Sequence, residues 1–204
     1  MVPDRSRLSV VCDQDRWYTG PLVDSPKIIC VPPDLPPSSP PDRHVHFTLI
    51  DRIIELKPDE RITAVKCLTM GEEYLQDHFP RFPVMPGVLM LESMYQAGSW
   101  LVRKSENFAH SMVMLKKASN VKYGNFVQPG QVLVLAAEMI KQDERHTTLK
   151  ASGTVDGQSA VSARLVLERY NLGDEDEERL ATDDYAREHY KGQFKVLIQS
   201  VKQV

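Results

Sequence analysis

The sequence lacks the features that mark several common classes of protein. No apolar run approaches the length that spans a bilayer, so we do not expect an integral membrane protein. Residues 1–7 have no apolar segment behind them and do not resemble a secretory signal. The three cysteines, Cys12, Cys30 and Cys67, have no metal-like spacing and indicate reduced thiols of a cytoplasmic protein. No Gly-rich phosphate loop, zinc cluster or nucleophile elbow is present, so neither a cofactor nor a metal is implied.

A strong net charge is also lacking, and the charge is unevenly distributed along the chain. The net charge is −3, but residues 174–190 hold eight acidic residues and two arginines, a net of −6. The rest of the chain therefore carries +3, since −3 minus −6 is +3. Such a mildly basic body suits an acidic macromolecular partner and is too weak to indicate nucleic-acid binding.

We expect three parts along the chain. Residues 1–42 form a proline-rich extension, which we predict to be an irregular arm or a segment that lies along the surface. Residues 43–170 hold the regular apolar patterns of a main domain, and residues 171–204 form an acidic, helical tail. A weak apolar stripe in this tail predicts that it docks loosely on the domain.

The main domain reads as one long apolar helix and about six strands. The helix is predicted at residues 86–104, where almost no polar face remains, so it should be buried. Asp156-Gly157 is a strong hairpin signal between the last two strands. This combination predicts an α+β fold with an antiparallel sheet packed on the helix. The predicted strands are residues 46–56, 60–69, 111–123, 131–142, 146–155 and 159–169.

The most informative stretch runs from His78 to Glu92. Glu92 falls within the apolar helix, where a carboxylate is rarely found without a partner. Pro86 suits the first helical position, and Gly87 leaves the backbone open at the positive end of the helix dipole. Taken singly, the histidine is usually a loop residue and the glutamate usually caps a backbone group. Together they indicate a base, an acid and an anion-stabilising helix terminus.

The segments around this stretch resemble the FabZ-type 3-hydroxyacyl-acyl-carrier-protein dehydratases. The resemblance is carried by the unbroken HFPRFPVMPGVLMLE and the following SMYQAG, and it covers roughly residues 43–170. It implies a hot-dog fold, in which an antiparallel sheet wraps around a long central helix. It also implies dehydration of (3R)-3-hydroxyacyl-acyl carrier protein (ACP) to trans-2-enoyl-ACP in fatty-acid or related lipid biosynthesis. Further matching segments are FTLIDR at 47–52, NVKY at 120–123, VQPG at 127–130 and GTVDG at 153–157.

The resemblance also assigns roles to residues of the motif. His78 is the general base, and Glu92 is the acid or the group that holds the departing water. The amide N–H of Gly87 or Val88 stabilises the thioester oxygen as negative charge develops there. These roles suit the side chains, because the ordinary pKa of histidine lies near neutrality and a carboxylic acid in an apolar setting can stay protonated. Gln96, one turn beyond Glu92, either orients its carboxyl group or binds a strand carbonyl.

For partners, the resemblance implies acidic ACP docking on Lys116, Lys117 and Lys122. It further implies a homodimer or a trimer of dimers, with His78 of one chain facing Glu92 of the other. Asp77 stands where the family usually has glycine, and Gly124 and Asn125 replace two common basic residues.

Two other functions therefore stay open. One is a hot-dog thioesterase, which would release a free acid. The other is a non-catalytic subunit that keeps the fold without turnover.

Overall fold

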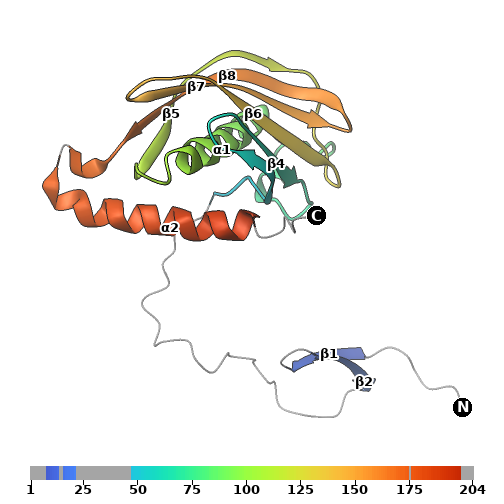
Figure 1. Cartoon of the computed structure of the whole chain (residues 1–204). Coiled ribbons are helices and arrows are strands. Elements are labelled where there is room, and N and C mark those ends of the chain that lie inside the picture. The colour runs from blue at the N-terminus through green and yellow to red at the C-terminus, as the bar shows by residue number, and fades with distance from the viewer. Residues whose placement is uncertain (1–7, 14–15, 22–46, 175, 199–204) are drawn as a thin grey trace, which may run out of the picture. The chain divides into compact units, whose positions relative to one another are not determined.

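The computed structural model describes residues 8–13, 16–21, 47–174 and 176–198, in two compact units of residues 1–45 and 46–204. In the first unit, β1 (Leu8–Asp13) and β2 (Arg16–Pro21) form an antiparallel pair (Figure 1). This corrects the prediction of an irregular arm for these residues. The valines of β1 and the Trp17-Tyr18 pair of β2 favour strands, and the proline clusters begin only at Pro32. Cys30, His44 and His46 lie outside the described residues.

The second unit is a six-stranded antiparallel sheet with two helices. The strand order is β3-β4-β6-β7-β8-β5. Figure 1 shows the long helix α1 (Gly87–Ser105) beneath the curved sheet, with α2 (Leu180–Ile198) on the far side of α1. This arrangement agrees with the predicted α+β class. The strands are β3 (Arg52–Lys57), β4 (Arg61–Cys67), β5 (Met112–Tyr123), β6 (Val132–Gln142), β7 (His146–Val155) and β8 (Gln158–Tyr170).

The hairpin between β7 and β8 forms where the sequence predicts it. Asp156 and Gly157 have φ values of 50° and 77°. Two consecutive positive φ values match the primed turn whose twist suits a two-residue hairpin. The register that this turn fixes places Leu149 opposite Leu165 and Ala151 opposite Ala163, all on the face that packs on α1.

Helix α1 is covered by the sheet on one side only. Met94, Ala97 and Leu101 are fully buried beneath the strands, and a Cβ atom at Gly98 would lie 2.5 Å from Leu149 Cδ1. Glycine at this position therefore lets the helix approach the sheet closely. On its other side the first half of the helix stays open, and Val88 is 68% exposed. The expectation that α1 is buried all round is therefore wrong for the single chain.

The C-terminal tail docks through specific contacts on the second half of α1. The Phe194 ring lies 6.1 Å from that of Trp100 and 5.6 Å from that of Phe108. The buried Arg103 guanidinium lies 3.7 Å from the centre of the Tyr190 ring and donates to the Ser111 carbonyl at 2.9 Å.

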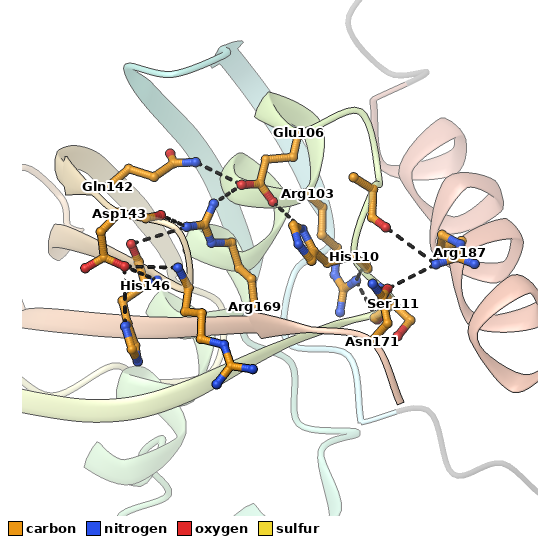
Figure 2. Close-up of polar contacts among 12 residues, drawn as sticks. Arg103, Glu106, His110, Ser111, Gln142, Asp143, His146, Arg169, Asn171 and Arg187 are labelled. Atoms are coloured by element: carbon orange, nitrogen blue, oxygen red, sulfur yellow. Dashed lines mark hydrogen bonds and ion pairs between the residues drawn. The ribbon is translucent and has the colours of Figure 1, made fainter. Parts of the chain in front are cut away.

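Polar contacts hold the start of the same tail. Asp183, fully buried, accepts hydrogen bonds from Ser111 Oγ and from the amides of Leu172 and Gly173. Arg187 reaches Asn171 Oδ1 at 3.0 Å, as Figure 2 shows. The predicted loose docking is thus wrong, because α2 completes the core beside Trp100. Among the described residues, neither helix is long and apolar enough to cross a membrane.

Candidate active site

His78 lies in the loop between β4 and α1 and is held there by backbone bonds. Its amide donates to the Tyr74 carbonyl at 3.1 Å, and its own carbonyl accepts from the Val84 amide at 3.1 Å. Its Nδ1 lies 2.9 Å from the Val84 carbonyl oxygen. A carbonyl can only accept, so Nδ1 carries the proton in this geometry. In the neutral form of the ring this leaves Nε2 unprotonated, as a general base requires.

The N-terminus of α1 offers free amide donors. Pro86 is the N-cap residue (φ −56°, ψ 137°), so the helix begins at Gly87, one residue later than predicted. The Pro86 carbonyl accepts from Leu89 and Met90 at 2.9 and 3.2 Å, but in the described part of the chain the Gly87 and Val88 amides have no acceptor. Two unsatisfied N–H groups at the positive end of a helix form a site for developing negative charge.

The ring of Tyr123 packs closely against Gly87. A Cβ atom on Gly87 would lie 2.9 Å from Tyr123 Cε1, closer than side chains normally approach. The segment 120–123 noted in the sequence thus packs directly on the helix start. No signal in the sequence links Tyr123 to Gly87, because the contact joins β5 to α1.

Glu92 lies one turn further along α1 and is half-buried. Its Oε1 accepts from Gln96 Nε2 at 3.0 Å, and among the described residues its Oε2 has no hydrogen-bond partner. Gln96 Nε2 also donates to the Phe47 carbonyl at 2.9 Å, and its Oε1 accepts from the Leu49 amide at 2.8 Å. The sequence left two roles open for Gln96, and the structure shows both contacts: Gln96 donates to the Glu92 carboxyl group and also binds the backbone before β3.

One cleft joins the segments on which these groups depend. It has a volume of about 360 Å³ and is lined by Phe47–Leu49, which Gln96 holds, and by Gly71–Tyr74, which precede His78; neither His78 nor Glu92 lines it. Within the described residues of one chain, His78 and Glu92 form neither a hydrogen bond nor an ion pair with each other.

The His78 loop and the start of α1 expose several large apolar side chains. The Phe82 and Phe126 rings meet edge to face at 5.7 Å. A contiguous apolar patch on a protein surface commonly marks an interaction site. The exposed apolar side chains of this surface are Phe79, Phe82, Val88, Tyr123 and Phe126.

The three lysines predicted to dock ACP are not equivalent. Lys116 Nζ binds both carboxylate oxygens of Glu168 at 2.9 Å. Lys117 and Lys122 are exposed and form no ion pair with any described residue. The charge available to a partner on β5 is thus smaller than the sequence suggests. The described residues contain no group of three or more side chains that could hold a metal ion.

Comparisons with known proteins agree with this architecture. A model of the FabA-like domain matches residues 41–164, more than half of the chain. The 3-hydroxyacyl-[acyl-carrier-protein] dehydratase FabZ of Levilactobacillus brevis is 45% identical over 116 residues, which are 57% of this chain and 78% of that protein. FabZ of Lactococcus lactis subsp. cremoris is 42% identical over 119 residues, 58% of this chain and 82% of that protein.

A solved structure is similar in fold. The dehydratase heterocomplex ApeI:P from Xenorhabdus doucetiae has a TM-score of 0.51 and 21% identity, covering 61% of this chain and 84% of that chain. At this identity the likeness shows the fold alone, and it confirms the hot-dog prediction. Helix α2 lies beyond the residues that the family model matches. The chain therefore belongs to the FabZ-type 3-hydroxyacyl-[acyl-carrier-protein] dehydratase family.

Proposed function

We propose that the protein dehydrates (3R)-3-hydroxyacyl-ACP to trans-2-enoyl-ACP, as a cytoplasmic hydro-lyase of fatty-acid or related lipid biosynthesis. The observation that carries this proposal is the Nδ1 contact of His78 with the Val84 carbonyl, which leaves Nε2 free to accept a proton. Family membership supplies the substrate class, since the relatives are named for this reaction.

The reaction divides between three groups of the chain. His78 Nε2 takes the proton from the carbon next to the thioester carbonyl. The Gly87 and Val88 amides stabilise the charge that develops on the carbonyl oxygen, and one such donor is typically worth about 3–4 kcal/mol. Glu92 then gives a proton to the hydroxyl group on the next carbon, so the carbon–oxygen bond breaks and water leaves. Gln96 occupies Oε1 of Glu92, which leaves Oε2 to carry the transferred proton.

We propose that two chains complete each site. The apolar surface around Phe79 and Phe82 and the open half of α1 supply a face that a second copy can cover. The family resemblance implies that His78 of one chain faces Glu92 of the other, and among the described residues no hydrogen bond or ion pair joins the two within one chain. A pocket between subunits is also dry and open at one end, as a pantetheine arm requires. The assembly is then a homodimer or a trimer of dimers.

The reaction is tested with a panel of 3-hydroxyacyl thioesters on ACP and on CoA, following the absorbance of the conjugated enoyl product. Loss of a general base typically lowers the rate on the order of 100- to 10,000-fold, which is the range expected for His78→Ala. Dehydration by His78→Ala within a few-fold of wild type would contradict the assignment. Release of free thiol without enoyl product would indicate a thioesterase instead.

The shared site is tested by complementation. His78→Ala and Glu92→Gln, each inactive alone, are refolded together in equal amounts. About half of the dimers are then mixed, and symmetry gives each mixed dimer one site with both changes and one with neither. Activity should return to about a quarter of wild type. If mass spectrometry shows mixed dimers but no activity returns, both groups come from the same chain.

A further inference from the structure

A partly buried ion pair lies at the base of the loop that carries His78. Lys66, near the end of β4, is only 6% exposed, and lysine is almost never so buried without a partner. Its Nζ lies 2.6 Å from Glu72 Oε1 and 3.6 Å from Asp51 Oδ1. Asp51 Oδ2 in turn accepts from the Cys67 amide at 2.5 Å. The cation therefore joins the loop to the two strands β3 and β4.

One short turn of backbone hydrogen bonds links Glu72 to His78. Glu72 precedes the 3-10 turn η1 (Glu73–Leu75), and its carbonyl accepts from the Leu75 amide at 3.1 Å. Within η1, the Tyr74 carbonyl accepts the His78 amide. The Tyr74 hydroxyl is buried without a partner among the described residues. Its burial, and to a lesser extent the nearby charges of Glu72 and Asp51, raise the pKa of Tyr74. The turn thus sits against the ion pair.

We propose that Lys66 and Glu72 are positioning residues that fix the direction of His78 Nε2 for the reaction. This inference rests on the proposed function, in which His78 is the base. Strand β4 is hydrogen-bonded on both sides within the sheet, so it is a rigid support. The ion pair ties Glu72 to that support, and η1 passes the constraint to the His78 backbone. The Val84 carbonyl then sets the rotation of the ring.

The first test is steady-state kinetics of Glu72→Gln, which keeps a hydrogen bond to Lys66 but removes the charge. Misplacement of a catalytic group by about 1 Å can cost on the order of 100-fold, so kcat should fall between about 10- and 100-fold. KM should stay within about two-fold, since substrate contacts are unchanged. Lys66→Met, after which the partly exposed Glu72 can turn toward water, should give the same loss.

The chain offers a matched control. Lys57 and Glu60 form an ion pair at the same 2.6 Å between the same residue types, but both side chains are at least half exposed and lie in the turn between β3 and β4. Glu60→Gln should leave kcat within about two-fold of wild type. A loss in Glu60→Gln equal to that in Glu72→Gln would mean that the effect is not specific to the His78 loop.

Two further readouts separate positioning from general destabilisation. In the His78→Ala background, Glu72→Gln should cause little further loss of the residual rate, because the group being positioned is gone. The same fractional loss in both backgrounds would refute the proposal. In ¹⁵N spectra of labelled protein, His78 should be the Nδ1–H tautomer in wild type and a mixture of tautomers in Glu72→Gln.

The spectra do not depend on turnover. Absence of dehydration in wild type would therefore overturn the proposed function, while an unchanged His78 tautomer in folded Glu72→Gln would overturn the positioning role. If Glu72→Gln does not fold, the same kinetics and spectra are measured on Lys66→Met, and an unchanged His78 tautomer in that variant would likewise overturn the positioning role.

Discussion

Gln96 is the side chain on which the fold and the proposed site depend together. Its amide makes three hydrogen bonds, at 2.8, 2.9 and 3.0 Å, to the backbone of Leu49, the backbone of Phe47 and the carboxyl group of Glu92. Gln96→Leu keeps the size of the side chain and removes all three. A net contribution of about 1 kcal/mol for each bond predicts that the free energy of unfolding falls by about 2–4 kcal/mol. The upper part of this range applies because the Leu49 amide has no access to water.

The same change should also lower the rate of dehydration. Glu92 loses the donor that fixes its Oε1, and one hydrogen bond of about 1–1.4 kcal/mol corresponds to roughly a 5- to 10-fold loss in kcat. Gln96→Glu gives a useful contrast. One carboxylate oxygen can still accept from Leu49, but both donors are gone and a second negative charge lies one helical turn from Glu92. We expect this variant to be the slower of the two.

Equilibrium unfolding in urea and steady-state dehydration test both parts. The slope of unfolding against denaturant should be unchanged, so that the midpoint alone shifts. Ser99→Ala serves as the control, because Ser99 Oγ bonds only the Gln96 carbonyl within the same helix. A Gln96→Leu protein whose unfolding free energy lies within about 0.5 kcal/mol of wild type would refute the three-bond account, since surface changes commonly fall in that range.

Three other perturbations have defined outcomes. Phe194→Ala should lower the free energy of unfolding of the whole domain by about 3–5 kcal/mol and leave kcat unchanged. If hydrogen exchange shows faster amide exchange only in α2, the tail opens alone and this prediction is wrong. Burial would raise the pKa of Asp183, but hydrogen bonds from Ser111, Gly173 and Leu172 outweigh it and lower that pKa. Its stabilisation is therefore present above the ordinary aspartate pKa of about 4 and is lost as pH falls through the lowered value. Asp183→Asn should be less stable than wild type at pH 7, with a difference that disappears in acid; an equal difference at both pH values would refute this. Reversing Lys117 and Lys122 to glutamate should raise KM for ACP substrates, less so at high salt, and spare CoA thioesters; equal losses on both carriers would exclude this docking face.

The regular elements were predictable where the apolar pattern is strong. The predicted helix 86–104 differs from α1 by one residue at each end, and the last four predicted strands agree with β5 to β8 within one residue. The first predicted strand, 46–56, was wrong at its start. Bonding to β4 begins with the Asp51 amide, which donates to the Val65 carbonyl at 2.9 Å. Residues 47–50 lie outside the strand, because the Leu49 amide and the Phe47 carbonyl bind the Gln96 side chain instead of a neighbouring strand. A bond between residues so far apart in sequence leaves no periodic signal.

The candidate reacting side chains could be named from the sequence, whereas the contacts that hold them could not. His78, Gly87 and Glu92 stand in one unbroken motif, so the resemblance identifies them directly. The Val84 carbonyl that orients His78 is a backbone group, and every residue has one. Lys66 and Glu72 read as ordinary surface charges in the sequence, since only the path of the loop brings the buried lysine and the partly exposed glutamate together. Arg103 and Asp183 were missed for the same reason, because charge in a sequence indicates exposure.

The two halves of helix α1 have different neighbours: the tail covers the second half, and the first half, which carries the candidate site, stays open. The tail closes the second half, where Arg103 packs on the Tyr190 ring and Trp100 on Phe194. The first half keeps Val88 and Glu92 facing outward from its own chain. Leaving that apolar face in water forgoes the stabilisation that its burial would give. In the proposed dimer, the surface that presents the acid is also the surface that a second copy covers, so assembly and formation of a dry catalytic pocket become the same event.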